Sequence, residues 1–185
     1  MRTSTLALPL AIALLMAGCT TTGGKDMLAA DAPRALPESG PVGVHWNDPA
    51  TFTELRHSRN RWDAERGNWV SELATYMRKR AEALLPNGER LELTITDVDR
   101  AGDYEPWHGM QHQDTRIVRD IYPPRMTVQV RHFDASGALV SEGERKLSDP
   151  AFLLGTTPIN DSDPLRYEKR MIDSWLRREL NTASR

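Results

Sequence analysis

Cysteine is nearly absent from this sequence: among 185 residues only Cys19 carries a thiol, which excludes a disulfide within the chain. A free thiol is a liability in an oxidising compartment, so the position of this one needs a reason. The apolar run that ends at it, residues 6–18, is too short to cross a bilayer, because a membrane-spanning helix takes roughly 20 residues.

The N-terminus instead has the parts of a secretory signal peptide: a positive charge at Arg2, a short apolar region and small residues at its end. Met16-Ala17-Gly18-Cys19 resembles the bacterial lipobox, in which the peptide is cut before the cysteine and the sulfur is acylated. This resemblance predicts a lipoprotein signal peptide over residues 1–18 and a lipid, with fatty acids such as palmitate, on Cys19. The alternative is an ordinary secretory peptide that contains a buried cysteine.

Several acyl chains on one cysteine give stable membrane attachment, where a single chain does not. Residue 20 is Thr, and in the enteric sorting rule an Asp at that position retains a lipoprotein in the inner membrane. We therefore expect the protein on the outer membrane of a Gram-negative bacterium, facing the periplasm.

Neither sign of charge is in clear excess, with 24 basic against 26 acidic residues, so composition gives no support for nucleic-acid binding. Residues 19–40 comprise the predicted lipidated cysteine and a stretch that is rich in Thr, Gly, Ala and Pro without an apolar period. This stretch, residues 20–40, is expected to form a flexible tether. Residues 41–182 are expected to form a single domain.

Alternating apolar residues predict strands at 42–46, 91–96 and 126–130, and a turn at 134–137 predicts an antiparallel partner after it. Helical spacing over 70–84, and again after the Asp163-Pro164 start signal, predicts two helices. The order indicates an α+β fold of two layers, with an antiparallel or mixed sheet of about four strands and two helices on one face.

Four blocks, VGVHWNDPATFTELR, LELTITDVDRAGDYEP, RDIYPPRM and LRYEKRMIDSWLRREL, resemble in this order a domain family of uncharacterised secreted and envelope proteins of proteobacteria. The resemblance covers about residues 41–180. It implies no activity, but it does imply that the residues important for structure or function lie in these blocks.

A metal site is one hypothesis, because acids and imidazoles gather between residues 97 and 112. Carboxylates and the nearby histidines are metal ligands, but the spacing matches neither a calcium loop nor a zinc helix. The weak candidate ligands are Asp97, Asp99, Asp103, His108 and His112.

No nucleophile motif and no glycine-rich phosphate loop occur, and no cofactor is expected. We therefore expect a non-catalytic envelope lipoprotein that binds a protein or an envelope polymer; the alternative is a periplasmic metal-dependent enzyme or metal-binding protein that uses the Asp97–His112 region. Candidate partner contacts are Trp107, in the long loop 100–120, and the basic residues Arg56, Arg59 and Arg61. The alternative for the basic residues is a solvated face balanced by acids such as Glu54.

Helical spacing also places one acid on the apolar side of the last helix. Glu168 falls near the middle of the apolar arc, which is defined by Leu165, Ile172, Trp175 and Leu176. A buried carboxylate needs a partner, and Arg125 and Arg119 are the nearest candidates. We expect a structural ion pair with Arg125, because a bidentate guanidinium is the usual partner of a buried carboxylate.

Overall fold

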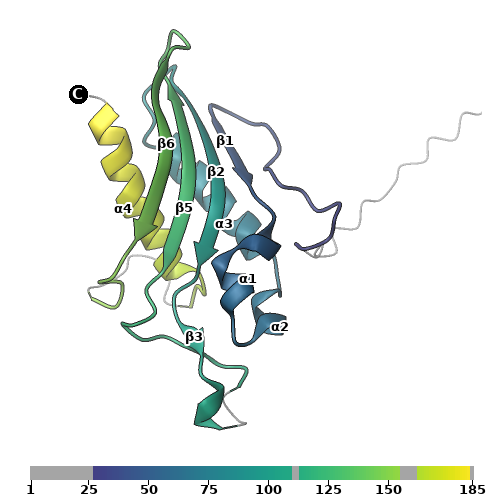
Figure 1. Cartoon of the computed structure of the whole chain (residues 1–185). Helices are drawn as coiled ribbons and strands as arrows, with labels where there is room; N and C mark the ends of the chain where they lie inside the picture. The colour runs from purple at the N-terminus through teal and green to yellow at the C-terminus, as the bar shows by residue number, and fades with distance from the viewer. Residues whose placement is uncertain (1–26, 110–112, 155–161, 184–185) are drawn as a thin grey trace, which may run out of the picture.

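The computed structural model describes residues 27–109, 113–154 and 162–183 (Figure 1). The expected signal peptide and Cys19 lie outside these residues. Within them, no helix is long and apolar enough to cross a bilayer. The described part forms a two-layer α+β domain, which confirms the predicted fold class.

One layer is a four-stranded mixed sheet in which the strands lie in the order β1-β2-β5-β6. The strands are β1 (Val42–Trp46), β2 (Arg90–Asp99), β5 (Arg125–Phe133) and β6 (Leu139–Ser148). β1 runs parallel to β2, whereas the β2–β5 and β5–β6 pairs are antiparallel. The predicted turn joins β5 to β6, where Asp134 Oδ1 accepts hydrogen bonds from the amides of Ser136 and Ala138 at 2.8 and 2.9 Å.

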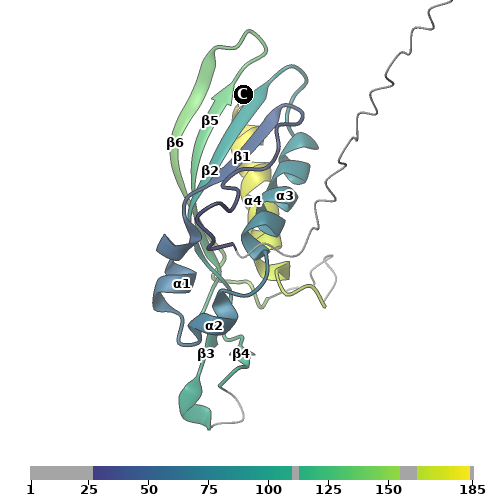
Figure 2. The same cartoon turned by 90° about the vertical axis from the view of Figure 1, so that its right-hand side faces the viewer.

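The other layer consists of α3 (Trp69–Glu82) and α4 (Arg166–Ala183), which cover the same face of the sheet (Figure 2). Leu73 and Met77 of α3 and Ile172 and Leu176 of α4 are fully buried, as their helical spacing predicted. Burying a side chain of this size stabilises the fold by about 1.5–3 kcal/mol. The start signal of α4 is also confirmed, because Asp163 Oδ1 accepts a hydrogen bond from the Leu165 amide at 2.8 Å.

A β-bulge in β2 changes which of its side chains face the helices. Leu93 and Ile95 are buried against them, the pairing register shifts between Ile95 and Asp97, and Val98 is the next buried residue. The extra residue moves the alternation by one position. Asp97 and Asp99 consequently point to the other face of the sheet.

Two regions for which no helix or strand was predicted contain short helices, turns and strands. The arginine-rich stretch after β1 forms a 3-10 turn and two short helices: η1 (Pro49–Thr51), α1 (Thr53–His57) and α2 (Arg61–Ala64). The expected long loop 100–120 holds a small two-stranded ribbon and another turn: β3 (Asp103–Tyr104), η2 (Pro106–His108) and β4 (Arg116–Ile117). Asn60 Nδ2 donates to Asp114 Oδ1 at 2.8 Å, so the start of α2 is tied to this region.

Residues 27–36 pack against the domain, which corrects the prediction of a flexible tether for this part of residues 20–40. Met27 is 8% exposed and belongs to the core. The Leu36 amide donates to Val44 O at 3.0 Å, and the Trp46 amide donates to Arg34 O at 2.9 Å. The segment therefore covers the outer edge of β1, while residues 19–26 lie outside the described part.

Candidate functional site

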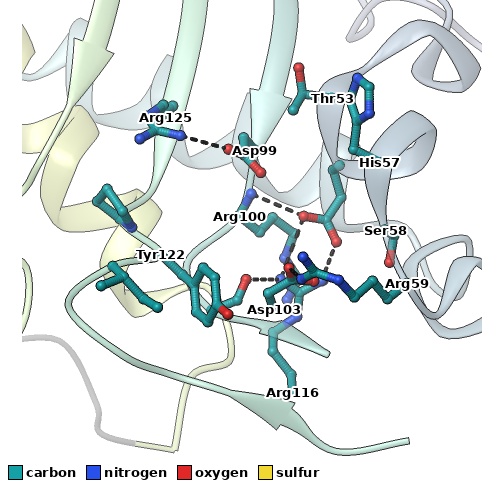
Figure 3. Close-up of a pocket in the computed structure, with 14 residues that line it drawn as sticks. Thr53, His57, Ser58, Arg59, Asp99, Arg100, Asp103, Arg116, Tyr122 and Arg125 are labelled. Carbon is teal, nitrogen blue, oxygen red and sulfur yellow. Dashed lines mark hydrogen bonds and ion pairs between the residues drawn. The ribbon is translucent and has the colours of Figure 1, made fainter. Parts of the chain in front are cut away.

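A polar pocket of about 210 Å³ lies where α1, the end of β2, the β3–β4 ribbon and the loop before β5 meet (Figure 3). Half of the residues that line it are acids or arginines: Glu54, Arg59, Asp99, Arg100, Asp103, Arg116 and Arg125. His57 also lines it. Ser58, Ile121 and Tyr122 complete much of the remaining wall. The pocket is thus suited to a polar or charged group rather than to an apolar ligand.

Each carboxylate in the lining is held by an arginine. Arg125 Nη1 lies 3.3 Å from Asp99 Oδ2, and Arg59 pairs with Asp103. At the bottom, Glu54 pairs with Arg116. Guanidinium–carboxylate pairs of this kind fix the direction of both side chains.

Glu54 and Arg116 tie α1 to the ribbon. Glu54 is only 4% exposed, and its Oε2 also accepts a hydrogen bond from the Arg100 amide at 3.0 Å. Arg116 Nη1 donates to Gly102 O at 2.9 Å. Gly102 has φ +81°, and a Cβ on it would lie 2.8 Å from Ile117 O, so only glycine allows the two strands of the ribbon to approach this closely.

Burial changes two acid–base equilibria around the pocket. Burial, and then the nearby charge of Glu54, raise the pKa of Asp99 above its ordinary value, against the opposing effect of Arg125. Burial and the hydrogen bond to Asp63 raise the pKa of the Tyr104 phenol to about 12. Tyr104 therefore stays protonated and acts as a hydrogen-bond donor between the ribbon and α2.

Trp107 and Arg59, two of the predicted partner contacts, lie next to each other. The Arg59 guanidinium carbon is 5.0 Å from the Trp107 ring centroid, a distance typical of a cation–π contact. The Trp107 side chain remains 59% exposed. Of the four candidates only Arg59 lines the pocket, and Trp107 lies beside it. Arg56 is exposed on α1, and Arg61 pairs with Glu65.

The weak metal candidates are not gathered into a site within the described residues, where no three His, Cys, Asp or Glu side chains are placed to hold an ion. Asp97 accepts hydrogen bonds from the amide and hydroxyl of Thr53 at 2.6 and 2.7 Å. Asp99 and Asp103 pair with arginines of the pocket. His112 and the side chain of His108 lie outside the described part.

Glu168 is buried as predicted, at 1% exposed, but its partner is not Arg125. Its Oε1 accepts a hydrogen bond from the Ala101 amide at 2.7 Å. Arg125 lies directly opposite Asp99 in the β2–β5 pairing and faces away from the helices, so it cannot reach α4. Burial raises the pKa of Glu168, and the nearby charges of Arg100 and Arg116 oppose that rise.

The burial of two carboxylates was not predicted from the sequence. The alternative interpretation of the basic residues placed Glu54 on a solvated face. A helix as short as α1 shows no period that would reveal its buried side. Glu105 is 1% exposed and lies 3.0 Å from both Arg119 Nη2 and the Tyr122 hydroxyl. A strand of two residues gives no alternation either, so the burial of the residue after β3 had no signal.

The comparisons with known proteins bear on the whole domain. Residues 40–178 match a family described as "Protein of unknown function (DUF3016)". The chain belongs to this family. The match spans the region in which the four blocks were recognised, and three of those blocks supply pocket residues of the DUF3016 domain.

No curated protein matches the chain. A solved structure with a similar chain is the crystal structure of a candidate lipoprotein from Caulobacter crescentus CB15, at 2.40 Å resolution. It is 16% identical, the alignment covers 60% of this chain and 80% of that chain, and the TM-score is 0.33. This likeness is too low to carry an argument about fold or function.

Proposed function

We propose that the protein is a lipid-anchored, non-catalytic component of the bacterial envelope, whose DUF3016 domain binds a protein or polymer partner next to the membrane. The observation that carries the binding part is the contact between exposed Trp107 and Arg59, which lines the charged pocket. The anchor rests on the lipobox-like sequence that ends at Cys19.

The composition around the pocket is typical of a partner-binding surface. Tryptophan, tyrosine and arginine dominate the binding energy of protein interfaces. Here Tyr122, Arg59 and Arg125 line one polar pocket, and Trp107 packs on Arg59 beside it. Ile121 adds an apolar side chain that is 63% exposed. A partner that covered Trp107 and Ile121 would bury apolar surface, and the arginines would fix its orientation.

The chemistry of the lining favours binding over catalysis. A nucleophilic mechanism needs a hydroxyl or thiol in hydrogen-bond contact with a base. His57 is the one imidazole in the lining, and among the described residues it has no hydrogen bond to a serine, threonine or carboxylate. The carboxylates that could serve as general bases are each held by an arginine.

The anchor would keep this surface close to the membrane. Cys19 and the packed residue Met27 are only a few residues apart, so even a fully extended chain between them spans less than about 30 Å. A lipid on Cys19, placed on the outer membrane as the sorting rule suggests, would therefore restrict the domain to partners at the periplasmic face.

Capture of the partner from cells tests the binding part, and the chain offers a matched control. Trp62 is 66% exposed and has Arg66 at 4.6 Å from its ring, but this arginine, unlike Arg59, does not line the pocket. Proteins cross-linked to the anchored chain in cells should be recovered with wild type and Trp62→Ala and lost with Trp107→Ala. Equal recovery with both variants, or equal loss, would contradict the proposal.

A further inference from the structure

The sheet has one covered edge and one open edge. Residues 34–36 pair with β1 on its outer side through the Ala35–His45 bridge. At the opposite edge, β6 pairs with β5 alone, and no described segment lies along its other side. An edge strand presents unpaired amide and carbonyl groups that can accept another strand.

Figure 1 shows α4 beside β6. Side chains of these two elements line a groove at this open edge. Its volume is about 640 Å³, three times that of the pocket described above. Arg145 forms the connection between the two elements, because its Nε donates to both oxygens of Glu179 at 2.9 and 3.0 Å and its Nη2 donates to Ser141 Oγ at 3.0 Å.

The groove carries more positive than negative charge. Arg145, Lys146 and Arg178 line it, against Glu179 alone. The Lys146 side chain is 80% exposed. An acidic group that entered here would meet cations at the side of the groove that faces solvent.

Trp175 supplies an independent observation. It lines the groove and is only 6% exposed, and its indole Nε1 is buried without a hydrogen-bond partner among the described residues. A buried N–H without an acceptor costs about 1–3 kcal/mol, so buried donors are normally paired. A carboxylate or carbonyl oxygen in the groove would give this donor its acceptor.

We propose that β6 and α4 form a binding site for an extended, acidic peptide segment of a partner protein. The segment adds a strand to β6, and every second side chain then points toward the helix side, into the groove. Acidic side chains at these positions face Arg178 of α4, Lys146 meets the segment from the outer face of β6, and one oxygen accepts from Trp175 Nε1. The site is formed by β6 and α4, whereas Trp107 lies in η2, between β2 and β5 in the chain. It depends neither on the Trp107 surface nor on the lipid anchor.

The test uses the full chain in detergent and a probe peptide about as long as β6, with alternating Val and Asp. The same peptide with Lys in place of Asp, and an N-methylated Val-Asp peptide that cannot pair as a strand, are the controls. The acidic peptide should bind, slow hydrogen exchange of β6 amides and shift the indole N–H resonance that Trp175→Phe removes.

Lys146→Glu with Arg178→Glu should weaken binding of the acidic peptide at least about fivefold. Lys79→Glu with Arg66→Glu, at two exposed positions outside the groove, makes the same change of charge and should leave binding unchanged. Both variants should melt like wild type. Equal binding of the acidic and basic peptides, or protection elsewhere than β6, would overturn the proposal. So would β6 protection in the peptide-free protein that rises with its concentration, because a second copy would then occupy the edge.

Discussion

Glu168 gives the sharpest test of how the domain is held together at the end of the sheet that carries the pocket. Its carboxylate is buried under the turn after β2, where it accepts the hydrogen bond from the Ala101 amide. Its second oxygen has no hydrogen-bond partner among the described residues. We therefore expect the group to act as a hydrogen-bond acceptor for the backbone rather than as half of an ion pair.

The loss of stability expected for Glu168→Ala follows from these contacts. Glu168→Ala leaves the buried Ala101 amide without an acceptor, which costs about 1–3 kcal/mol. The lost methylene adds about 0.8 kcal/mol, and a residual cavity adds more. The sum is about 2–4 kcal/mol, which lowers the melting temperature by roughly 5–15 °C for a domain of this size. Glu168→Gln keeps the volume and one acceptor oxygen, so it should be at least as stable as wild type near neutral pH.

The contribution of Glu168 to the stability of the fold should decrease as the pH rises. Because burial raises the pKa of Glu168 in the folded state, the folded protein holds its proton more tightly than the unfolded chain does. The stability that this group contributes is therefore complete below its unfolded pKa of about 4.3 and is lost as pH rises through the folded pKa. Glu168→Gln lacks this titration, so its advantage over wild type should grow with rising pH.

Urea unfolding of wild type, Glu168→Ala and Glu168→Gln at several pH values measures all three expectations. A Glu168→Ala protein that unfolds like wild type would show that the acid is not buried. A Glu168→Gln protein as unstable as Glu168→Ala would show that the negative charge itself is needed, as in an ion pair, and would refute the acceptor role.

Three further predictions concern other parts of the chain. Arg116→Ala should destabilise the domain by about 3–5 kcal/mol in thermal or urea unfolding, because it leaves buried Glu54 unpaired. Arg125→Ala should cost less than about 1 kcal/mol, because the Arg125 side chain is 60% exposed. Equal losses of stability in the two variants would contradict the assigned pairs. Cys19→Ala should abolish labelling by a fatty-acid analogue and leave the melting temperature unchanged, and labelling that persists would exclude this cysteine as the anchor. Limited proteolysis should remove residues up to about Met27 and then stop, since residues 27–36 are packed; trimming to residue 40 would show that they are not.

The long helices and strands could be predicted because their apolar pattern repeats over enough residues to be recognised. α3 and α4 have apolar residues at helical spacing over several turns, and the strands β1, β2 and β5 alternate. The same arc on α4 placed Glu168 on the buried side. In each case the local pattern and the final packing agree, so the sequence was sufficient.

The partners of the buried acids could not be predicted, since they depend on how loops return to the domain. The bulge after Ile95 changes the faces of β2 by one residue, and nothing in the apolar pattern of LELTIT announces it. Beyond the bulge the chain turns so that the Ala101 amide reaches Glu168. Arg125 was chosen by its nearness in the order of the blocks, but alternation along β5 sends it to the opposite face from buried Met126.

The packed N-terminal segment was missed for a related reason. Residues 27–36 have too few apolar residues to show a period, yet Met27, Leu28 and Leu36 are placed against the core by two backbone hydrogen bonds to β1. A single bridge to an edge strand leaves no alternation to detect.

The central claim is that the DUF3016 domain binds a partner through the Trp107–Arg59 surface. A photoreactive amino acid at position 107 tests it most directly, with position 79 on the helix side as the control and ultraviolet cross-linking in intact cells. We predict a discrete adduct from position 107 in the membrane fraction, absent from position 79 and lost when Arg59→Glu is added. No adduct at position 107, or the same adduct from both positions, would contradict the account.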